Sequence, residues 1–233
     1  MAISLFSRLL DFISPRTCVI CGNRLTVTEG HICGVCIMRL PRTHFHLTPY
    51  ENKMAENFYV LVKKLGKAAA FFYYHPHSKS TKIILSLKYG DNPAIGITLG
   101  RLMATEMQPS GFFDDVDVML PMPLTRKRRW GRGYNQSEQI AQGISQITHI
   151  PLLSHAVRRT SFKRSQTQLH RRERMENVEG VFTLRKNPQL KNKHVLIIDD
   201  VCTTGATIIA LANTIQEAGV KEISILTAGF TQA

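Results

Sequence analysis

The 233-residue sequence has no run of about 20 apolar residues, so it predicts no membrane-spanning helix. Its first apolar stretch, residues 1–15, is interrupted by Arg8 and Asp11, and no small-residue cleavage site follows it. This is not the pattern of a secretory signal peptide, and its apolar spacing favours a short docking helix. Without a secretion signal, we expect a protein of the cytoplasm.

Internal repeats and low-complexity segments are also missing, which excludes the fibrous and low-complexity classes. Apolar residues make up 43% of the chain, enough to form a folded core. The length allows one substantial α/β domain with a small appendage, or two small domains.

Acidic residues are scarce where basic residues are most frequent. The formal net charge is +13, and ten of these charges arise in residues 126–174, where twelve Lys and Arg accompany only Glu138 and Glu173. Such a concentrated field attracts polyanions, for example nucleic acid, polyphosphates or an anionic membrane. A solvated basic face has the same composition, so the charge alone does not choose between these interpretations.

Four of the five cysteines, Cys18, Cys21, Cys33 and Cys36, form a C-x2-C-x11-C-x2-C pattern. Each C-x2-C turn directs two thiolates to one point, and two such turns complete the tetrahedral sulfur site that Zn²⁺ prefers. A rubredoxin-type iron site has the same ligands, and two disulfides are a further alternative that the missing secretion signal disfavours. We expect a structural zinc site, with His31 as a bystander because four thiolates saturate the ion.

A ribbon of roughly 30 residues has almost no core of its own, so a bound metal would supply most of its folding free energy. We therefore predict two parts. Residues 1–45 form the N-terminal helix and zinc ribbon, and residues 46–233 form the larger domain.

The larger domain is expected to alternate strands with helices. The periodicity and the Gly and Pro positions predict strands within 55–74, at 116–120, 150–153, 194–198 and 222–229, and helices at 81–90, 94–107, 136–147 and 208–215. A basic loop is expected after 125, and Asn135 is expected to cap the helix that follows, with Glu138 reaching back to it. This alternation predicts an α/β fold with a doubly wound parallel sheet.

Residues 195–207, Val-Leu-Ile-Ile-Asp-Asp-Val-Cys-Thr-Thr-Gly-Ala-Thr, carry the strongest functional signal. A buried strand ends in Asp199 and Asp200, and ligands of a parallel sheet bind at the carboxyl ends of its strands. The amides at the start of the next helix can hold a phosphate, with threonine hydroxyls beside them and Gly205 allowing close approach. Acids beside a phosphate are suited to neutral hydroxyl groups, so the pattern indicates a sugar phosphate.

This stretch resembles the signature with which type I phosphoribosyltransferases bind phosphoribosyl pyrophosphate (PRPP). The resemblance implies that Asp199 and Asp200 hold the 2′- and 3′-hydroxyls of the ribose at the catalytic centre. It implies that the following loop holds the 5′-phosphate, through Thr203, Thr204, Gly205, Ala206 and Thr207. We interpret Cys202 as a small loop residue rather than a nucleophile, because no activating base can be assigned to it.

Further motifs extend the resemblance over nearly the whole chain. They are Leu-Lys-Tyr-Gly-Asp at 87–91, Pro-Met-Pro-Leu at 121–124, Arg-Gly-Tyr-Asn-Gln at 132–136 and Arg-Arg-Thr at 158–160. With the four-cysteine ribbon in front, their order resembles the ComF family of competence-associated, phosphoribosyltransferase-like proteins.

The resemblance to type I phosphoribosyltransferases also implies a pyrophosphate-binding loop and a lid. The loop would use Met122, Pro123 and Arg126, assisted by Arg132, and the planar guanidinium suits bidentate contacts to pyrophosphate. Mg²⁺ would accompany PRPP and neutralise the pyrophosphate. Residues 160–174 would close over the sugar as a mobile loop.

The ComF resemblance implies a role in DNA uptake during natural transformation, in which the chain handles incoming single-stranded DNA with proteins of the competence machinery. The basic segment offers Arg128 and Arg129 for phosphates, and Trp130 and Tyr134 for stacking on bases. Two alternatives stay open: a metabolic phosphoribosyltransferase acting on a small base or amine, and a non-catalytic module that responds to PRPP. No counterpart of the base-recognising hood is found, which leaves open whether the chain is an enzyme.

Overall fold

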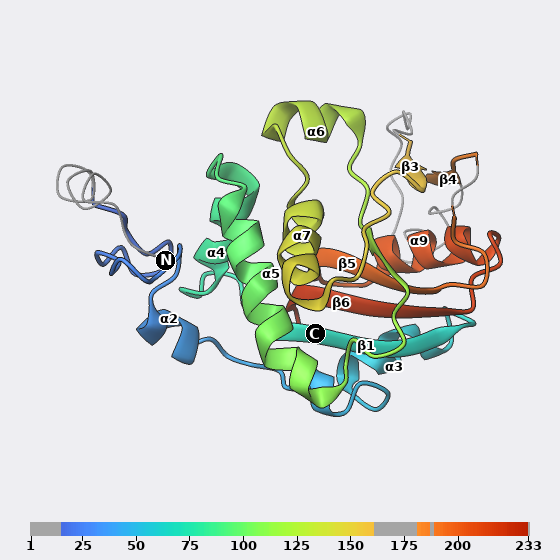
Figure 1. Cartoon of the computed structure of the whole chain (residues 1–233), viewed down its shortest axis with the longest axis horizontal. Helices are drawn as coiled ribbons and strands as arrows, with labels where there is room; N and C mark the ends of the chain where they lie inside the picture. The colour runs from blue at the N-terminus through green and yellow to red at the C-terminus, as the bar shows by residue number, and fades with distance from the viewer. Residues whose placement is uncertain (1–14, 161–180, 187–188, 233) are drawn as a thin grey trace, which may run out of the picture.

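A computed structural model describes residues 15–160, 181–186 and 189–232 (Figure 1). Its centre is a four-stranded parallel sheet in the order β1-β6-β5-β2. The strands are β1 (Leu65–Tyr73), β2 (Val118–Pro121), β5 (His194–Cys202) and β6 (Glu222–Phe230). A separate antiparallel pair joins β3 (Val157–Arg159) to β4 (Phe182–Leu184). The predicted α/β class with a parallel sheet is confirmed, whereas the predicted lid and N-terminal helix lie almost wholly outside the described residues.

Helices cover the sheet, as the burial of its strands requires. In chain order they are α2 (Gly34–Met38), α3 (Lys53–Tyr59), α4 (Thr81–Tyr89), α5 (Ala94–Met107), α6 (Arg126–Arg132), α7 (Gln136–Thr148) and α9 (Ala206–Gln216), with short 3-10 turns at Phe45–Leu47 and Gln108–Ser110. Helix α7 packs against β5 and β2, α3 against β1, and α9 against β5. Figure 1 shows α6 standing apart from the sheet, beyond one end of α7.

Strand β5 lies between β6 and β2, and its apolar part, from Val195 to Ile198, is fully buried. A strand covered on both faces is a continuous apolar run rather than an alternating one. Pro121 at the end of β2 pairs with Ile198, and the amide of Met122 donates to the Ile198 carbonyl at 2.8 Å. The loop after β2 therefore begins beside Asp199, where the apolar part of β5 ends.

Helices α5 and α7 approach until their backbones touch. A Cβ atom on Gly100 would lie 2.0 Å from the carbonyl oxygen of Ile140, and one on Gly143 would lie 2.2 Å from that of Ile97. Only glycine fits at such a contact. This packing sets where the first turn of α7 meets the carboxyl ends of the strands.

Two predicted elements differ from the structure. Strands were expected within residues 55–74, and Leu65–Tyr73 is indeed β1. The first part of the range lies in α3 instead, because the Asn52 side chain accepts hydrogen bonds from the amides of Met54 and Ala55 and caps a helix there. The basic loop after residue 125 is the helix α6, which the Thr125 hydroxyl caps by accepting from the Arg128 amide at 3.3 Å. Short side-chain caps thus outweighed the strand-like and loop-like composition.

Two further predictions hold only in part. The strand expected at 150–153 is a single parallel bridge between Leu152 and Met119 at the edge of β2. Asn135 caps α7 as expected, by accepting from the Ser137 amide at 3.2 Å. Glu138 does not reach back to the cap, however, and its carboxylate lies 3.8 Å from the guanidinium of Arg129.

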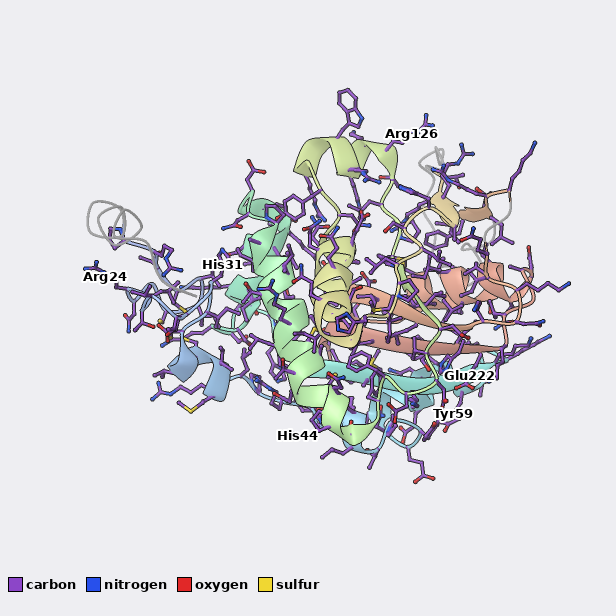
Figure 2. The ribbon with its side chains drawn as sticks, in the orientation of Figure 1. Arg24, His31, His44, Tyr59, Arg126 and Glu222 are labelled. Carbon is purple, nitrogen blue, oxygen red and sulfur yellow. The ribbon has the colours of Figure 1, made fainter. Side chains whose placement is uncertain are left out.

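The four-cysteine ribbon lies at the end of the molecule away from β3 and β4 (Figure 1). His31 in the ribbon hydrogen bonds to the hydroxyl of Thr98 on α5 at 3.0 Å, and Figure 2 shows its side chain in this part of the molecule. The predicted boundary at 45/46 follows Phe45, whose ring packs edge-on against Phe230 of β6, and this division stays a prediction. Within the described ranges, no helix is both long and apolar enough to cross a bilayer.

Candidate functional site

The four predicted metal ligands, Cys18, Cys21, Cys33 and Cys36, converge in the ribbon. Their sulfur atoms all lie within 4.8 Å of one another, and the Sγ atoms of Cys21 and Cys33 are 3.8 Å apart. A tetrahedral ion with Zn–S bonds of about 2.3 Å requires sulfur atoms roughly 3.8 Å apart, so the cluster fits such an ion. The Cys33 amide donates to the Cys18 sulfur at 3.4 Å. The cluster could therefore hold a metal ion such as zinc, while His31 points to α5 instead.

Asp199 and Asp200 lie in the second half of β5, where the strand faces the first turn of α7. The Ser137 hydroxyl donates to Oδ1 of Asp199 at 3.0 Å, and the Asp200 amide donates to the same oxygen at 2.8 Å. The second acid is held differently, because the ammonium of Lys88 on α4 lies 2.9 Å from Oδ2 of Asp200. Each carboxylate thus has one anchored oxygen and keeps acceptor capacity for a ligand.

The environment of Asp199 raises the pKa of its carboxyl group. Burial, reinforced by the negative charge of Asp200, raises its pKa from the usual value near 4 to about 7. The Asp200 amide, the Ser137 hydroxyl and the charge of Lys88 oppose this shift without cancelling it. Perturbed carboxyl groups in a cavity are typical of functional sites.

The loop after β5 turns into α9 at Gly205. Gly205 has φ +74°, and a Cβ atom there would lie 2.8 Å from the buried ring of Phe58 on α3. The position therefore requires glycine for both its backbone and its packing. Helix α9 begins directly afterwards, so its first amides lie beside the exposed Thr203 and Thr204. Such a helix start is a ready anion site.

A cavity of about 350 Å³, here called the carboxylate cavity, opens at the carboxyl ends of β2 and β5. Predicted PRPP residues in its lining are Met122, Arg132, Asp199, Asp200, Thr203 and Thr207. Lys88, Arg128 and Arg159 add three more cations to the same lining. Paired acids, threonine hydroxyls and four cations can together hold a ligand that bears hydroxyls at its centre and phosphates at its ends.

A second cavity of about 810 Å³, here called the α4–α6 cavity, lies between the end of α4 and α6. It is lined by the predicted nucleic-acid residues Arg128, Trp130 and Tyr134, and by Lys88, Tyr89 and Arg132. Trp130 is 90% exposed and Tyr89 is 74% exposed. The Arg132 guanidinium lies 5.5 Å from the centre of the Tyr89 ring, and the Tyr134 hydroxyl donates to the Leu87 carbonyl at 2.7 Å.

Six predicted PRPP or nucleic-acid residues contribute to neither lining: Pro123, Arg126, Arg129, Thr204, Gly205 and Ala206. Arg126 is exposed at the start of α6, and Figure 2 shows it there, while the guanidinium of Arg129 turns to Glu138. Thr204 accepts from the Ala206 amide at 3.5 Å, so it closes the loop rather than lining the cavity.

Sequence reasoning missed Lys88, Ser137 and Arg159 as site residues. Lys88 and Arg159 belong to motifs that the sequence displays, Leu-Lys-Tyr-Gly-Asp and Arg-Arg-Thr, but nothing local to those motifs points to the acids more than 35 residues away along the chain. Ser137 follows Arg-Gly-Tyr-Asn-Gln by one residue. Burial, with the charge of Arg128, lowers the pKa of Arg159, whose guanidinium also lies over the Phe182 ring.

Cys202 was expected in a loop, but it is the last residue of β5 and is buried. Burial, with the charge of Asp199, raises the pKa of its thiol to about 12. The thiol is therefore protonated near neutral pH, and a protonated thiol is a poor nucleophile.

Comparison with known proteins gives a family match and several relatives. Residues 132–229 match the phosphoribosyl transferase domain family. Competence protein F of Haemophilus influenzae is 33% identical over 148 residues, which span 61% of this chain and 64% of that protein. DNA utilization protein YhgH of Escherichia coli K12 is 29% identical over 211 residues, which span 89% of this chain and 87% of that protein.

Among solved structures, a similar one is the glutamine PRPP amidotransferase from Bacillus subtilis in complex with ADP and GMP. It is 19% identical, with a TM-score of 0.42, and the match covers 61% of this chain and 30% of that one.

Proposed function

We propose that this chain, which belongs to the ComF family of competence-associated, phosphoribosyltransferase-like proteins, binds PRPP and handles single-stranded DNA during DNA uptake. The single observation that carries the proposal is the carboxylate cavity, where paired acids, threonine hydroxyls and four cations line one space. The names of the relatives support the part that concerns DNA, as does the basic and aromatic helix α6. The cytoplasm is the compartment in which such a role would be carried out.

In this proposal the ribose lies against Asp199 and Asp200. Its 2′- and 3′-hydroxyls donate to the carboxylate oxygens that keep acceptor capacity. The 5′-phosphate lies at the start of α9, because the first amides of a helix have no acceptor within it and attract an anion. Carboxylates accept hydrogen bonds from hydroxyl groups, whereas they repel a phosphate. The two acids therefore bind the ribose, and the loop before α9 binds the 5′-phosphate.

The pyrophosphate of PRPP lies toward Arg128, Arg132 and Arg159. Arg132 is held in place by a 2.9 Å hydrogen bond that its guanidinium donates to the Gln136 side chain. Mg²⁺ accompanies PRPP and neutralises part of the pyrophosphate charge. The proposal concerns binding, and transfer of the ribosyl group to an acceptor is a separate step.

The cysteine cluster holds Zn²⁺ in a structural role. All four ligand positions are thiolates, so no position is left for substrate. The ribbon fixes the N-terminal part of the described chain to α5 through contacts such as that of His31 with Thr98.

Single-stranded DNA lies along α6 and the α4–α6 cavity. Cations on α6 contact the phosphates, and bases stack on Trp130 and Tyr134. Proteins of the competence machinery deliver the strand to this surface. Removing two cations with Arg128→Ala plus Arg129→Ala should reduce the magnitude of the salt slope of binding by about 1.4, at about 0.7 per cation for single strands. Lys82→Ala on the exposed side of α4 is a control of the same charge type and should leave the slope nearly unchanged.

The deciding experiment for PRPP is a thermal-shift titration with PRPP and Mg²⁺. A ligand that binds only the folded chain raises its unfolding temperature. The double variant Asp199→Asn with Asp200→Asn should lose this rise. A control pair, Asp114→Asn with Asp115→Asn, removes the same two charges from exposed acids outside the carboxylate cavity and should keep it. If PRPP fails to stabilise the wild-type chain, or stabilises the Asp199/Asp200 variant equally, the proposal is wrong.

A further inference from the structure

The carboxylate cavity and the α4–α6 cavity share one wall. Lys88, Arg128 and Arg132 line both cavities, so three cations face two separate spaces. Asp199 and Asp200 line only the carboxylate cavity, whereas Tyr89 and Trp130 line only the α4–α6 cavity. A ligand that binds these cations from one cavity therefore leaves fewer of them available to a ligand in the other cavity.

Two of the three cations are held within the wall by specific contacts. The Lys88 ammonium lies 2.9 Å from Asp200, and Arg132 is fixed between the Gln136 side chain and the Tyr89 ring. Each contact ties one cavity to the other, because Asp200 and Gln136 belong to the carboxylate cavity and Tyr89 to the α4–α6 cavity. Lys88 and Arg132 therefore cannot contact a polyanion in each cavity at the same time.

The α4–α6 cavity has the chemistry of a site for a nucleotide within a strand. Among its aromatic side chains, which include Tyr134, Trp130 and Tyr89 are largely exposed and can stack on bases. Its cations outnumber its one acid, Asp91, so it attracts phosphates. The phosphates of a strand bound here and the pyrophosphate of PRPP require the same three side chains.

We propose that PRPP and single-stranded DNA bind antagonistically, because they compete for the cations of the shared wall. The inference rests on the proposed function and adds its regulation: the chain releases a strand when PRPP fills the carboxylate cavity. PRPP also brings several negative charges next to the α4–α6 cavity, which repel the strand. By thermodynamic reciprocity, a bound strand weakens PRPP binding by the same factor.

The test measures the anisotropy of a fluorescently labelled oligo(dT) titrated with the full chain, with and without saturating PRPP and Mg²⁺, at one low ionic strength. Losing one charged contact to a phosphate weakens binding by about tenfold or more, so PRPP should raise the Kd for the oligonucleotide at least tenfold. Lys88→Ala should reduce this ratio, because it removes a shared cation. Lys82→Ala on the same helix lies outside both linings and should preserve it.

The double variant Asp199→Asn with Asp200→Asn separates competition at the site from general competition by anions. Its altered residues do not line the α4–α6 cavity, so it should bind the oligonucleotide but no longer respond to PRPP. If PRPP weakens oligonucleotide binding equally in this variant, the shared wall is not the cause and the inference is overturned. If PRPP stabilises the wild type but leaves its oligonucleotide affinity unchanged or tighter, the inference fails and PRPP binding stands. If PRPP gives no thermal shift, the proposed function fails first, and the inference falls with it.

Discussion

Replacing Gly205 by alanine should destabilise the chain through two separable effects. The position has φ +74°, and placing a non-glycine residue in this region costs about 1–2 kcal/mol. The new Cβ atom would lie 2.8 Å from the Phe58 ring, which is fully buried and must shift within the core. Such overpacking costs about 1–3 kcal/mol. The free energy of unfolding should therefore fall by about 2–5 kcal/mol, and the melting temperature by roughly 10 °C for a chain of this length.

Two other glycines isolate the contributions. Gly133 also has φ +73° but has open space where a Cβ atom would lie, so Gly133→Ala measures the backbone effect alone. Gly131 lies within α6, again in open space and without a positive φ, so Gly131→Ala should stabilise by about 0.5–1 kcal/mol. The assay is urea unfolding followed by circular dichroism, with PRPP thermal shifts on the same samples. If Gly205→Ala costs no more than Gly133→Ala, the close contact with Phe58 does not exist in solution.

Three further predictions concern protonation and metal. His194 is buried on β5, and burial lowers its pKa. The unfolded chain then binds the proton more readily, so stability present above about pH 6.5 should fall as the solution is acidified, and His194→Gln should flatten this trend in urea unfolding. PRPP affinity should rise from pH 6 to pH 8 as Asp199, whose pKa is raised to about 7, ionises and becomes a stronger acceptor, and calorimetry should show a smaller rise in Asp199→Asn. Mass spectrometry should find one zinc ion per chain. Cys36→Ser should lose the ion and melt at a lower temperature, whereas the control Cys202→Ser should keep the ion. An ion retained in Cys36→Ser would contradict the four-thiolate site.

Much of the fold could be predicted from the sequence because its patterns are local. The apolar run of β5 and the periodic stripe of α5 each arise from the packing of one element. Helix α5 was predicted with its observed bounds, and β5 was predicted from His194 to Ile198, although the strand continues through both acids to Cys202. Helix α3 was missed because a single capping residue, Asn52, decides it against a strand-like composition. Helix α6 was missed for a similar reason, since its seven residues have no buried face to produce a periodic signal.

The candidate site was predicted where its residues adjoin in the sequence, and at Met122 and Arg132 through the family resemblance. The acids and the phosphate loop follow one another along β5 and α9, and the cysteine pairs are recognisable from spacing alone. Lys88 and Arg159 reach the same cavity from other elements, and only the three-dimensional arrangement brings them to Asp200 and Asp199. Residues so far apart in the sequence show no fixed spacing, so a single sequence does not reveal that they lie in one cavity.

The touching backbones of α5 and α7 have a consequence for how the site tolerates change. Ser137 donates to Asp199 from the first turn of α7. The distance between α7 and α5 is set by the close contact at Gly100 and Gly143, and this distance fixes the position of that turn. A methyl group added at Gly100 or Gly143 would push α5 and α7 apart and move Ser137 away from Asp199. Neither glycine lines the carboxylate cavity. The grip on a sugar would then loosen from a distance, and a screen restricted to cavity-lining side chains would overlook the cause.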